Sequence, residues 1–248
     1  MSALVLALVA GAVIGLALGA LGGGGSVLAV PALIYLLGFT PAAATTASLI
    51  IVTATSAAAL YAHARDGNVR WKTGSLFTAA GVVPAILAGA VAGWLPEAVL
   101  TAAFAAIAAL AAVRMLKPSV SDGPSRSARP VRATGAGAGL GAVTGLLGVG
   151  GGFLAVPALV SVLGLRMRAA VGTSLLVITV NSLAALAART GTAGQADWAV
   201  IAPFAGAAIL GAWDGKRLAA KISGRTLQRI FAFVLLAVAA LMLIDVIV

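Results

Sequence analysis

Two glycine clusters, each inside a long apolar stretch, are the residues of this chain whose types and spacing could do chemistry. The first is Gly22–Gly25 followed by Ser26, and the second is Gly148–Gly152 with Val149 inside it. Each glycine costs a helix interior about 1 kcal/mol relative to alanine, so a run of them predicts that a helix stops. A new helix that starts there presents unbonded N–H groups and a positive dipole end, which bind an anion without a cationic side chain. We therefore expect a small anion to bind the backbone amides of Gly24, Gly25, Ser26, Gly150, Gly151 and Gly152.

A second polar set follows each cluster, where the next apolar stretch begins. It comprises Thr46 and Ser48 after the first cluster, and Thr173 and Ser174 after the second. Their hydroxyls could donate to the oxygens of a bound anion, or could instead bond backbone carbonyls one turn back in their own helix. Asn181 joins the set because a side-chain amide inside a membrane helix requires a polar partner. Together they are predicted to complete the shell around the substrate.

Two ionisable residues are candidates for coupling or gating. His63 ends an apolar stretch and titrates near neutral pH, so it is a candidate proton carrier or else a cap at the membrane interface. Arg189 takes the equivalent position in the second half of the chain, where it could draw anions to an outer vestibule or extend its charge to the headgroups. The acidic residues lie at or near the ends of the apolar stretches, so no carboxylate proton relay is expected.

The chemistry that the sequence lacks narrows the function further. The chain contains no cysteine and a single histidine, so neither a metal site nor a cofactor is expected. Its apolar stretches hold no paired carboxylates and no nucleophile beside a base. No catalytic residue is therefore assigned, and the protein is predicted not to be an enzyme.

Membrane helices are the elements that must position these residues. Of the 248 residues, 62% are hydrophobic and 9% are charged, whereas about a quarter of a soluble domain is charged. Several apolar stretches reach the roughly 20 residues with which a helix crosses a ~30 Å hydrocarbon core, and none alternates as barrel strands do. The net charge of +10 lies in short clusters between these stretches, as in cytoplasmic loops. The sequence thus predicts an all-α polytopic membrane protein that does not bind nucleic acid.

The chain contains two copies of one unit. A shift of 126 positions aligns Leu28–Leu33 with the identical Leu154–Leu159. The same shift superposes two ladders of glycines spaced four residues apart, which predict close packing faces between helices: Gly11, Gly15 and Gly19 in one copy, and Gly137, Gly141 and Gly145 in the other. Each copy is predicted to be a glycine-broken segment followed by three membrane helices. The expected segments are 3–37, 42–62, 73–94 and 98–114 in the first copy, and 133–163, 169–188, 198–213 and 227–247 in the second.

Charge orients the two copies, which span residues 1–116 and 133–248. The linker between them, residues 117–132, is rich in Ser, Pro and Arg and is predicted to be cytoplasmic. The other basic clusters between the apolar stretches lie on the cytoplasmic side, together with the linker, only if each broken segment begins and ends on one side of the membrane. The second copy is then inverted relative to the first, and both termini are extracytoplasmic. Inverted repeats around a midplane site are typical of secondary transporters, so the two breaks are expected to converge on one site.

Four stretches of the chain carry recognisable motifs. Two of them are Gly19–Leu33 (GALGGGGSVLAVPAL) and its partner Gly145–Leu159 (GLLGVGGGFLAVPAL). The other two are Ala170–Leu175 (AVGTSL) and the loop His63–Trp71 (HARDGNVRW). Together these motifs resemble the TauE/SafE family of sulfite exporters, although the first copy has Thr46-Ala47-Ser48 where the family has its GTS element. The resemblance implies a multi-pass protein of the bacterial inner membrane that moves sulfite, an organosulfonate or a related organic or sulfur-containing anion.

The hypothesis is a secondary transporter that works by alternating access between the two inverted copies. Its partners would be the small anion, membrane lipid and a coupling proton or other ion. The sequence is compatible with a homo-oligomer as well as with a monomer. A passive anion channel is the main alternative, and its flux would ignore a proton gradient. A lipid-modifying membrane enzyme and a non-transporting scaffold are weaker alternatives, because the spans lack catalytic groups and a scaffold would not bind anions saturably.

Overall fold

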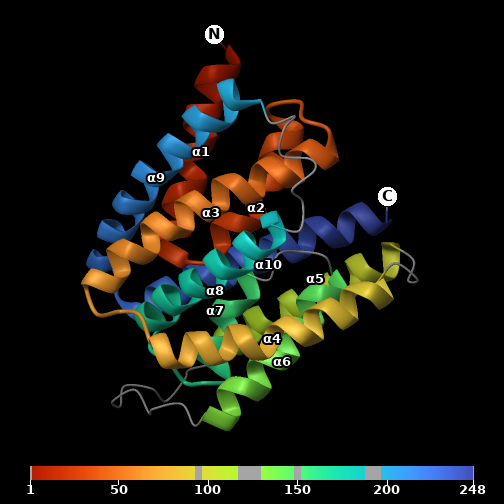
Figure 1. The fold of residues 1–248 in the computed structure, drawn as a ribbon, viewed down its shortest axis with the longest axis vertical. Coiled ribbons are helices and arrows are strands. Elements are labelled where there is room, and N and C mark those ends of the chain that lie inside the picture. Colours follow the sequence, from red (N-terminus) through yellow and green to blue (C-terminus); the bar gives the residue numbers. More distant parts are fainter. Residues whose placement is uncertain (1, 93–96, 117–129, 148–151, 188–196, 248) are drawn as a thin grey trace.

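The computed structural model describes residues 2–92, 97–116, 130–147, 152–187 and 197–247. Within these residues the chain forms ten helices and no strand (Figure 1). The first copy contains α1 (Ser2–Leu21), α2 (Gly24–Tyr35), α3 (Pro41–Arg65), α4 (Trp71–Ala92) and α5 (Glu97–Leu116). The second contains α6 (Pro130–Leu147), α7 (Gly152–Ser161), α8 (Met167–Ala187), α9 (Trp198–Lys221) and α10 (Gly224–Ile247).

Four helices of the described residues are long and apolar enough to cross a membrane: Ala3–Leu21, Ala43–Arg65, Met167–Ala187 and Trp198–Lys221. Large apolar side chains also point outward from the bundle, as on α4, where Val83, Ile86 and Leu87 are each more than 60% exposed. Water would oppose the exposure of such a surface, whereas lipid accommodates it. The prediction of an all-helical, multi-pass membrane protein is therefore confirmed.

The first glycine cluster does interrupt a helix, as predicted. The helix α1 ends at Leu21, and α2 begins at Gly24 after the two-residue break Gly22–Gly23. The helix α2 then folds back against α1, so that Ala29 and Leu33 of α2 share one buried cluster with Ile14 of α1. The second cluster falls at residues 148–151, which lie outside the described residues, between the end of α6 and the start of α7.

Two long helix pairs each join a helix of one copy to a helix of the other. The helix α1 of the first copy packs along α9 of the second, and α6 of the second copy packs along α4 of the first. Figure 1 shows these two pairs on opposite sides of α3 and α8, which pack against each other in the centre. The sequence repeat equates α1 with α6 and α4 with α9, so the two pairs are equivalent interfaces.

The glycine ladders form these interfaces, as the spacing predicted. A side chain on Gly11 would collide with the backbone of Phe204 in α9, and one on Gly137 would collide with the backbone of Phe77 in α4. Phe77 and Phe204 are themselves equivalent in the repeat, with one residue inserted in the second copy. The absence of a Cβ lets the helix backbones approach closely, and dispersion contacts then stabilise each pair.

The helix α9 is longer than the sequence predicted. The expected segment ended at residue 213, but α9 continues for two more turns to Lys221. The extension is helical because one of its faces stays buried: Gly215 packs against Leu16 of α1, and Ala219 is 5% exposed. The charge of Lys216 is compensated there by Asp66, whose Oδ2 lies 2.7 Å from Nζ.

Candidate functional site

The first break is a sharp turn packed against the second copy. Gly22 has a φ of +74°, a left-handed conformation that residues with a Cβ rarely adopt. A Cβ at Gly22 would lie 2.5 Å from Oγ of Ser174 and 3.4 Å from Cα of Val171, both in α8. Ser174, which the sequence predicted near a bound anion, therefore does contact the break. Gly24, Gly25 and Ser26 form the first turn of α2 directly after it.

The GTS element of the second copy, Gly172-Thr173-Ser174, is buried between this break and the α3–α4 loop. A Cβ at Gly172 would lie 2.6 Å from the carbonyl oxygen of Asn68. The backbone N–H of Arg70 donates a 3.1 Å hydrogen bond to Oγ1 of Thr173. The hydroxyl of Ser174 donates to the carbonyl of Val171 at 2.8 Å, the bond to its own helix that the sequence left as an alternative.

The other predicted ligands of the described residues lie on α3, α7 and α8. Ser48 is buried in α3 and donates to the carbonyl of Thr45 at 2.8 Å, while Thr46 is buried one turn into the same helix. Asn181 is half-buried in α8, seven residues beyond Ser174, a rise of roughly 10 Å along the helix axis. Gly152 is buried at the start of α7. Gly150, Gly151 and Arg189 lie outside the described residues, so their roles stay predictions.

His63 is buried beside the end of α1. Its side chain is 4% exposed, and its Nε2 lies 3.1 Å from the carbonyl oxygen of Gly19. A carbonyl only accepts, so Nε2 carries the hydrogen of this bond and Nδ1 is left as the acceptor nitrogen. Within the described part of the chain, the buried Nδ1 has no hydrogen-bond partner. His63 thus caps a carbonyl in the last turn of α1.

A small cavity adjoins His63 and the break. Its volume is about 240 Å³, and its lining includes His63, Asp66, Lys216 and Arg168 as well as Ala20 and Val171, which flank Gly22. Lys216 pairs with Asp66 and also donates a 2.6 Å hydrogen bond to the carbonyl of Ala62. We call this space the inner chamber. Of its charged side chains, two are cationic and one is anionic, so the chamber favours a negatively charged occupant.

A larger cavity of about 830 Å³ lies next to the inner chamber, and we call it the arginine cavity. It lies where the α3–α4, α7–α8 and α9–α10 connections meet the end of α5. Its arginines are Arg70, Arg166, Arg168, Arg225 and Arg229, and none of the described residues that line it is acidic. From the sequence, these arginines were interpreted only as signals of which loops are cytoplasmic. The one sequence signal that could have suggested a shared site is that these arginines lie just before or at the start of α4, α8 and α10.

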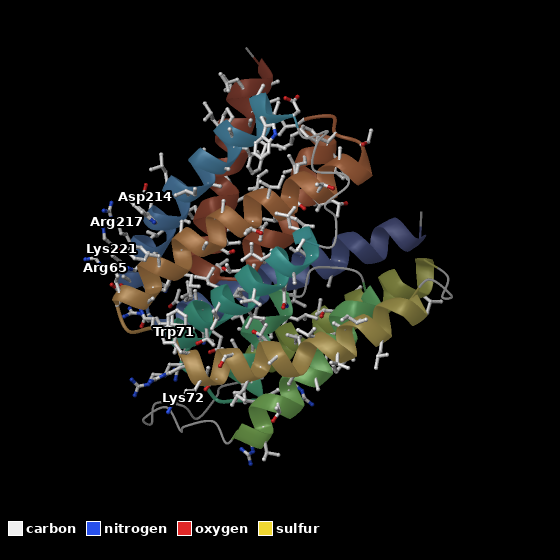
Figure 2. All side chains as sticks on the ribbon, viewed as in Figure 1. Arg65, Trp71, Lys72, Asp214, Arg217 and Lys221 are labelled. Carbon is white, nitrogen blue, oxygen red and sulfur yellow. The ribbon has the colours of Figure 1, made fainter. Side chains whose placement is uncertain are left out.

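The basic connections gather at one end of the bundle. Figure 2 shows Arg65, Arg217 and Lys221 at the same edge of the molecule as Lys72, and the pair between Lys216 and Asp66 ties α9 to the end of α3. We call this the basic end. Within the described ranges no three His, Asp or Glu side chains gather as metal ligands would.

Comparison with known proteins gives one consistent result. The family model described as "Sulfite exporter TauE/SafE" matches residues 7–242. Two proteins from different strains of Xylella fastidiosa, each named "Probable membrane transporter protein", are 33% and 30% identical to this chain over 244 residues. Each alignment covers 95% of this chain and 93% of the relative. A family model and full-length relatives thus agree with the duplicated glycine motifs, and the chain belongs to the TauE/SafE family of membrane transporters.

Proposed function

We propose that this protein is a secondary transporter that moves a small anion across the bacterial inner membrane. The proposed substrate is sulfite, an organosulfonate or a related organic or sulfur-containing anion, because the matching family model is described as a sulfite exporter. Both termini would lie on the extracytoplasmic side and the basic end on the cytoplasmic side, in line with the positive-inside rule.

The contact between the inner chamber and the first glycine break carries this proposal. The chamber is lined by Ala20 and Val171, and the first turn of α2 starts two residues after Gly22. A helix that stops inside the membrane leaves polar backbone groups, which persist only against protein or a water-filled cavity. The amides of Gly24, Gly25 and Ser26, at the positive end of α2, would therefore bind an anion that enters from the chamber.

The exchanged helix pairs support alternating access. Because α1–α9 and α6–α4 are equivalent interfaces, the copies fit an arrangement in which one is inverted relative to the other. The first break lies near the start of α8, at the basic end. The second break lies outside the described residues, and we propose that it meets the first on one path across the membrane. Rocking of one copy against the other would then expose this path to each side of the membrane in turn, as in other transporters built from inverted repeats.

His63 is the proposed proton-coupling residue. Its Nδ1 is buried without a described partner and its ring lines the inner chamber, so a proton taken up there would add a positive charge beside the anion path. Arg189, its repeat equivalent, would attract anions at the opposite end. Thr46, Ser48, Thr173, Ser174, Asn181 and the amides of Gly150–Gly152 are proposed to complete the path.

The test is anion flux in proteoliposomes that contain Gly25→Leu, with Gly206→Leu as the matched control. Gly206 lies in α9, and a Cβ there meets nothing within 4 Å, so leucine at this position should leave transport unchanged. We expect Gly25→Leu to reduce saturable flux of labelled sulfite at least about tenfold, equivalent to 1.4 kcal/mol of lost interaction. Equal flux in the two variants would refute the amide cradle. Wild-type flux that follows only voltage and concentration, whatever the imposed pH gradient, would identify a passive channel.

A further inference from the structure

We propose that the arginine cavity is an oxyanion-binding site that receives the anion at the basic end, before it reaches the inner chamber. Its role as a vestibule rests on the transport function proposed above, whereas oxyanion binding by the cavity does not. The relevant chemistry is that of tetrahedral or pyramidal groups such as sulfate, sulfite, sulfonate or phosphate.

The lining of the cavity selects for this ligand class. Arginine presents a planar fork of N–H donors that matches the oxygens of sulfur and phosphorus oxyanions in pairs. Five arginines from three separate segments line one cavity, and none of the described residues that line it is acidic. Charges of one sign around a concave site focus the potential and raise the local concentration of counter-ions. The arrangement is thus unfavourable for cations and favourable for anions.

The size of the two cavities suggests an order of passage. The arginine cavity, at about 830 Å³, falls in the ~300–1,000 Å³ range of sites for small organic ligands. The inner chamber, at about 240 Å³, is smaller than that range and suits a small ion. A hydrated anion could therefore enter the first space, and it would have to lose part of its hydration shell to enter the second.

Arg168 and Asn68 join the two cavities, because both residues line both spaces. Arg168 is held in place by α9: its Nη2 donates to the carbonyl of Ala220 at 2.9 Å and to that of Ile222 at 3.3 Å. These carbonyls lie at the carboxyl end of a helix, where a cation is favourable. The bonds use only one of the guanidinium nitrogens, so Arg168 can present the others to an anion that passes between the cavities.

The inner chamber supplies independent support, since it continues this route toward the break. It contains the buried His63, whose Nδ1 has no partner within the described part of the chain, and it reaches Ala20 beside Gly22. A continuous series of positively charged and polar groups thus runs from the basic end to the start of α2.

The experiment measures sulfate binding by calorimetry, with the full chain in nanodiscs of zwitterionic lipid. The test variant is Arg225→Gln/Arg229→Gln, and the control is Arg217→Gln/Lys221→Gln, which removes the same charge from exposed residues outside both cavities. We expect sulfate to bind about tenfold more weakly to the test variant, equivalent to 1.4 kcal/mol, and with unchanged affinity to the control. Arg229→Lys keeps the charge but loses the fork, so it should weaken binding less than glutamine does.

The transport arm separates this inference from the proposed function. In proteoliposomes, Arg225→Gln/Arg229→Gln should raise the KM for anions supplied at the basic end and leave kcat unchanged, while the control variant matches the wild type. Sulfate binding that depends on these arginines without any saturable flux would refute the transport function and leave the binding site standing. Equal sulfate affinity in the test and control variants would overturn the inference.

Anionic lipid is the other source of the same oxyanion chemistry. The calorimetry is therefore repeated in nanodiscs that contain phosphatidylglycerol, and bound lipid is measured by native mass spectrometry. Sulfate affinity that is the same in both lipids supports a site for the free anion. Phosphatidylglycerol that stays bound to the wild type, blocks sulfate and is lost from the test variant would overturn the proposal in favour of a lipid site.

Discussion

Substitution of Gly22 by alanine tests the first break, because it introduces two separable costs. The left-handed backbone, with a φ of +74°, costs a residue with a Cβ about 1–2 kcal/mol. The new methyl would also lie 2.5 Å from Oγ of Ser174 and 3.2 Å from Cγ2 of Val156, an overpacking that costs about 1–3 kcal/mol. Gly22→Ala should therefore lower the free energy of unfolding by about 2–5 kcal/mol.

Gly38 supplies the matched control. It has nearly the same backbone, with a φ of +70°, but a Cβ there meets nothing within 4 Å. Gly38→Ala should thus show the conformational cost alone, about 1–2 kcal/mol. Removing the hydroxyl with Ser174→Ala should restore part of the loss in Gly22→Ala, so the double variant should be more stable than the two single effects added together.

The assay is equilibrium unfolding in detergent micelles, followed by the fluorescence of the four tryptophans. The free energies of the wild type, the three single variants and the double variant give the coupling between the break and Ser174. If Gly22→Ala costs no more than Gly38→Ala, or if its effect and that of Ser174→Ala simply add, the contact between the break and α8 is refuted.

Three further predictions concern packing and coupling. Gly141→Ala would place a methyl against the backbone of α4, so it should separate α4 from α6 and lower the midpoint of thermal unfolding. Gly139→Ala is the control, because a Cβ there meets nothing within 4 Å and the midpoint should not change. Equal midpoints in the two variants would contradict the packing face. Thr179→Val removes the 3.0 Å hydrogen bond from Thr179 in α8 to Ser56 in α3. It should lower the free energy of unfolding by about 1 kcal/mol in the same micelle assay. An unchanged free energy would show that this bond does not stabilise the packing of α3 against α8. His63→Gln can still donate to the carbonyl of Gly19 but cannot titrate, so anion flux should lose its response to an imposed pH gradient; an undiminished response would exclude His63 as the coupling residue.

The helical segments could be predicted closely from the sequence because local residues mark their ends. Glycines interrupt the first broken segment at Gly22, and Thr40 with Pro41 marks the start of α3, where Oγ1 of Thr40 accepts from the N–H of Ala43 at 3.4 Å. The repeat doubled the glycine signals, but Thr40 and Pro41 correspond to Arg166 and Met167 in the second copy. Gly38 and Gly164, which are equivalent in the two copies, share a left-handed φ of +70° and +66°.

The cavities could not be predicted, because they depend on how distant segments pack. Arg70 and Arg229 are far apart in the sequence, and nothing in either neighbourhood indicates the other. From the sequence, the loop arginines were therefore interpreted as orientation signals, and anion binding was predicted at backbone amides and at hydroxyl and amide side chains. The length of α9 was underestimated for a related reason: Lys216 lies in an apolar helix only because Asp66 of α3 compensates its charge.

The pairing of α1 with α9 has a consequence for biogenesis. The small-residue face of α1 is synthesised well before its partner α9, which ends at Lys221, some 200 residues later. At about 5–20 residues per second, α1 waits roughly 10–40 s in the bilayer before that partner emerges from the ribosome. During that interval its bare glycine face is open to other helices or to an insertion chaperone. Each copy needs a helix of the other copy to cover its glycine face. The two halves therefore assemble late, after α9 has been synthesised.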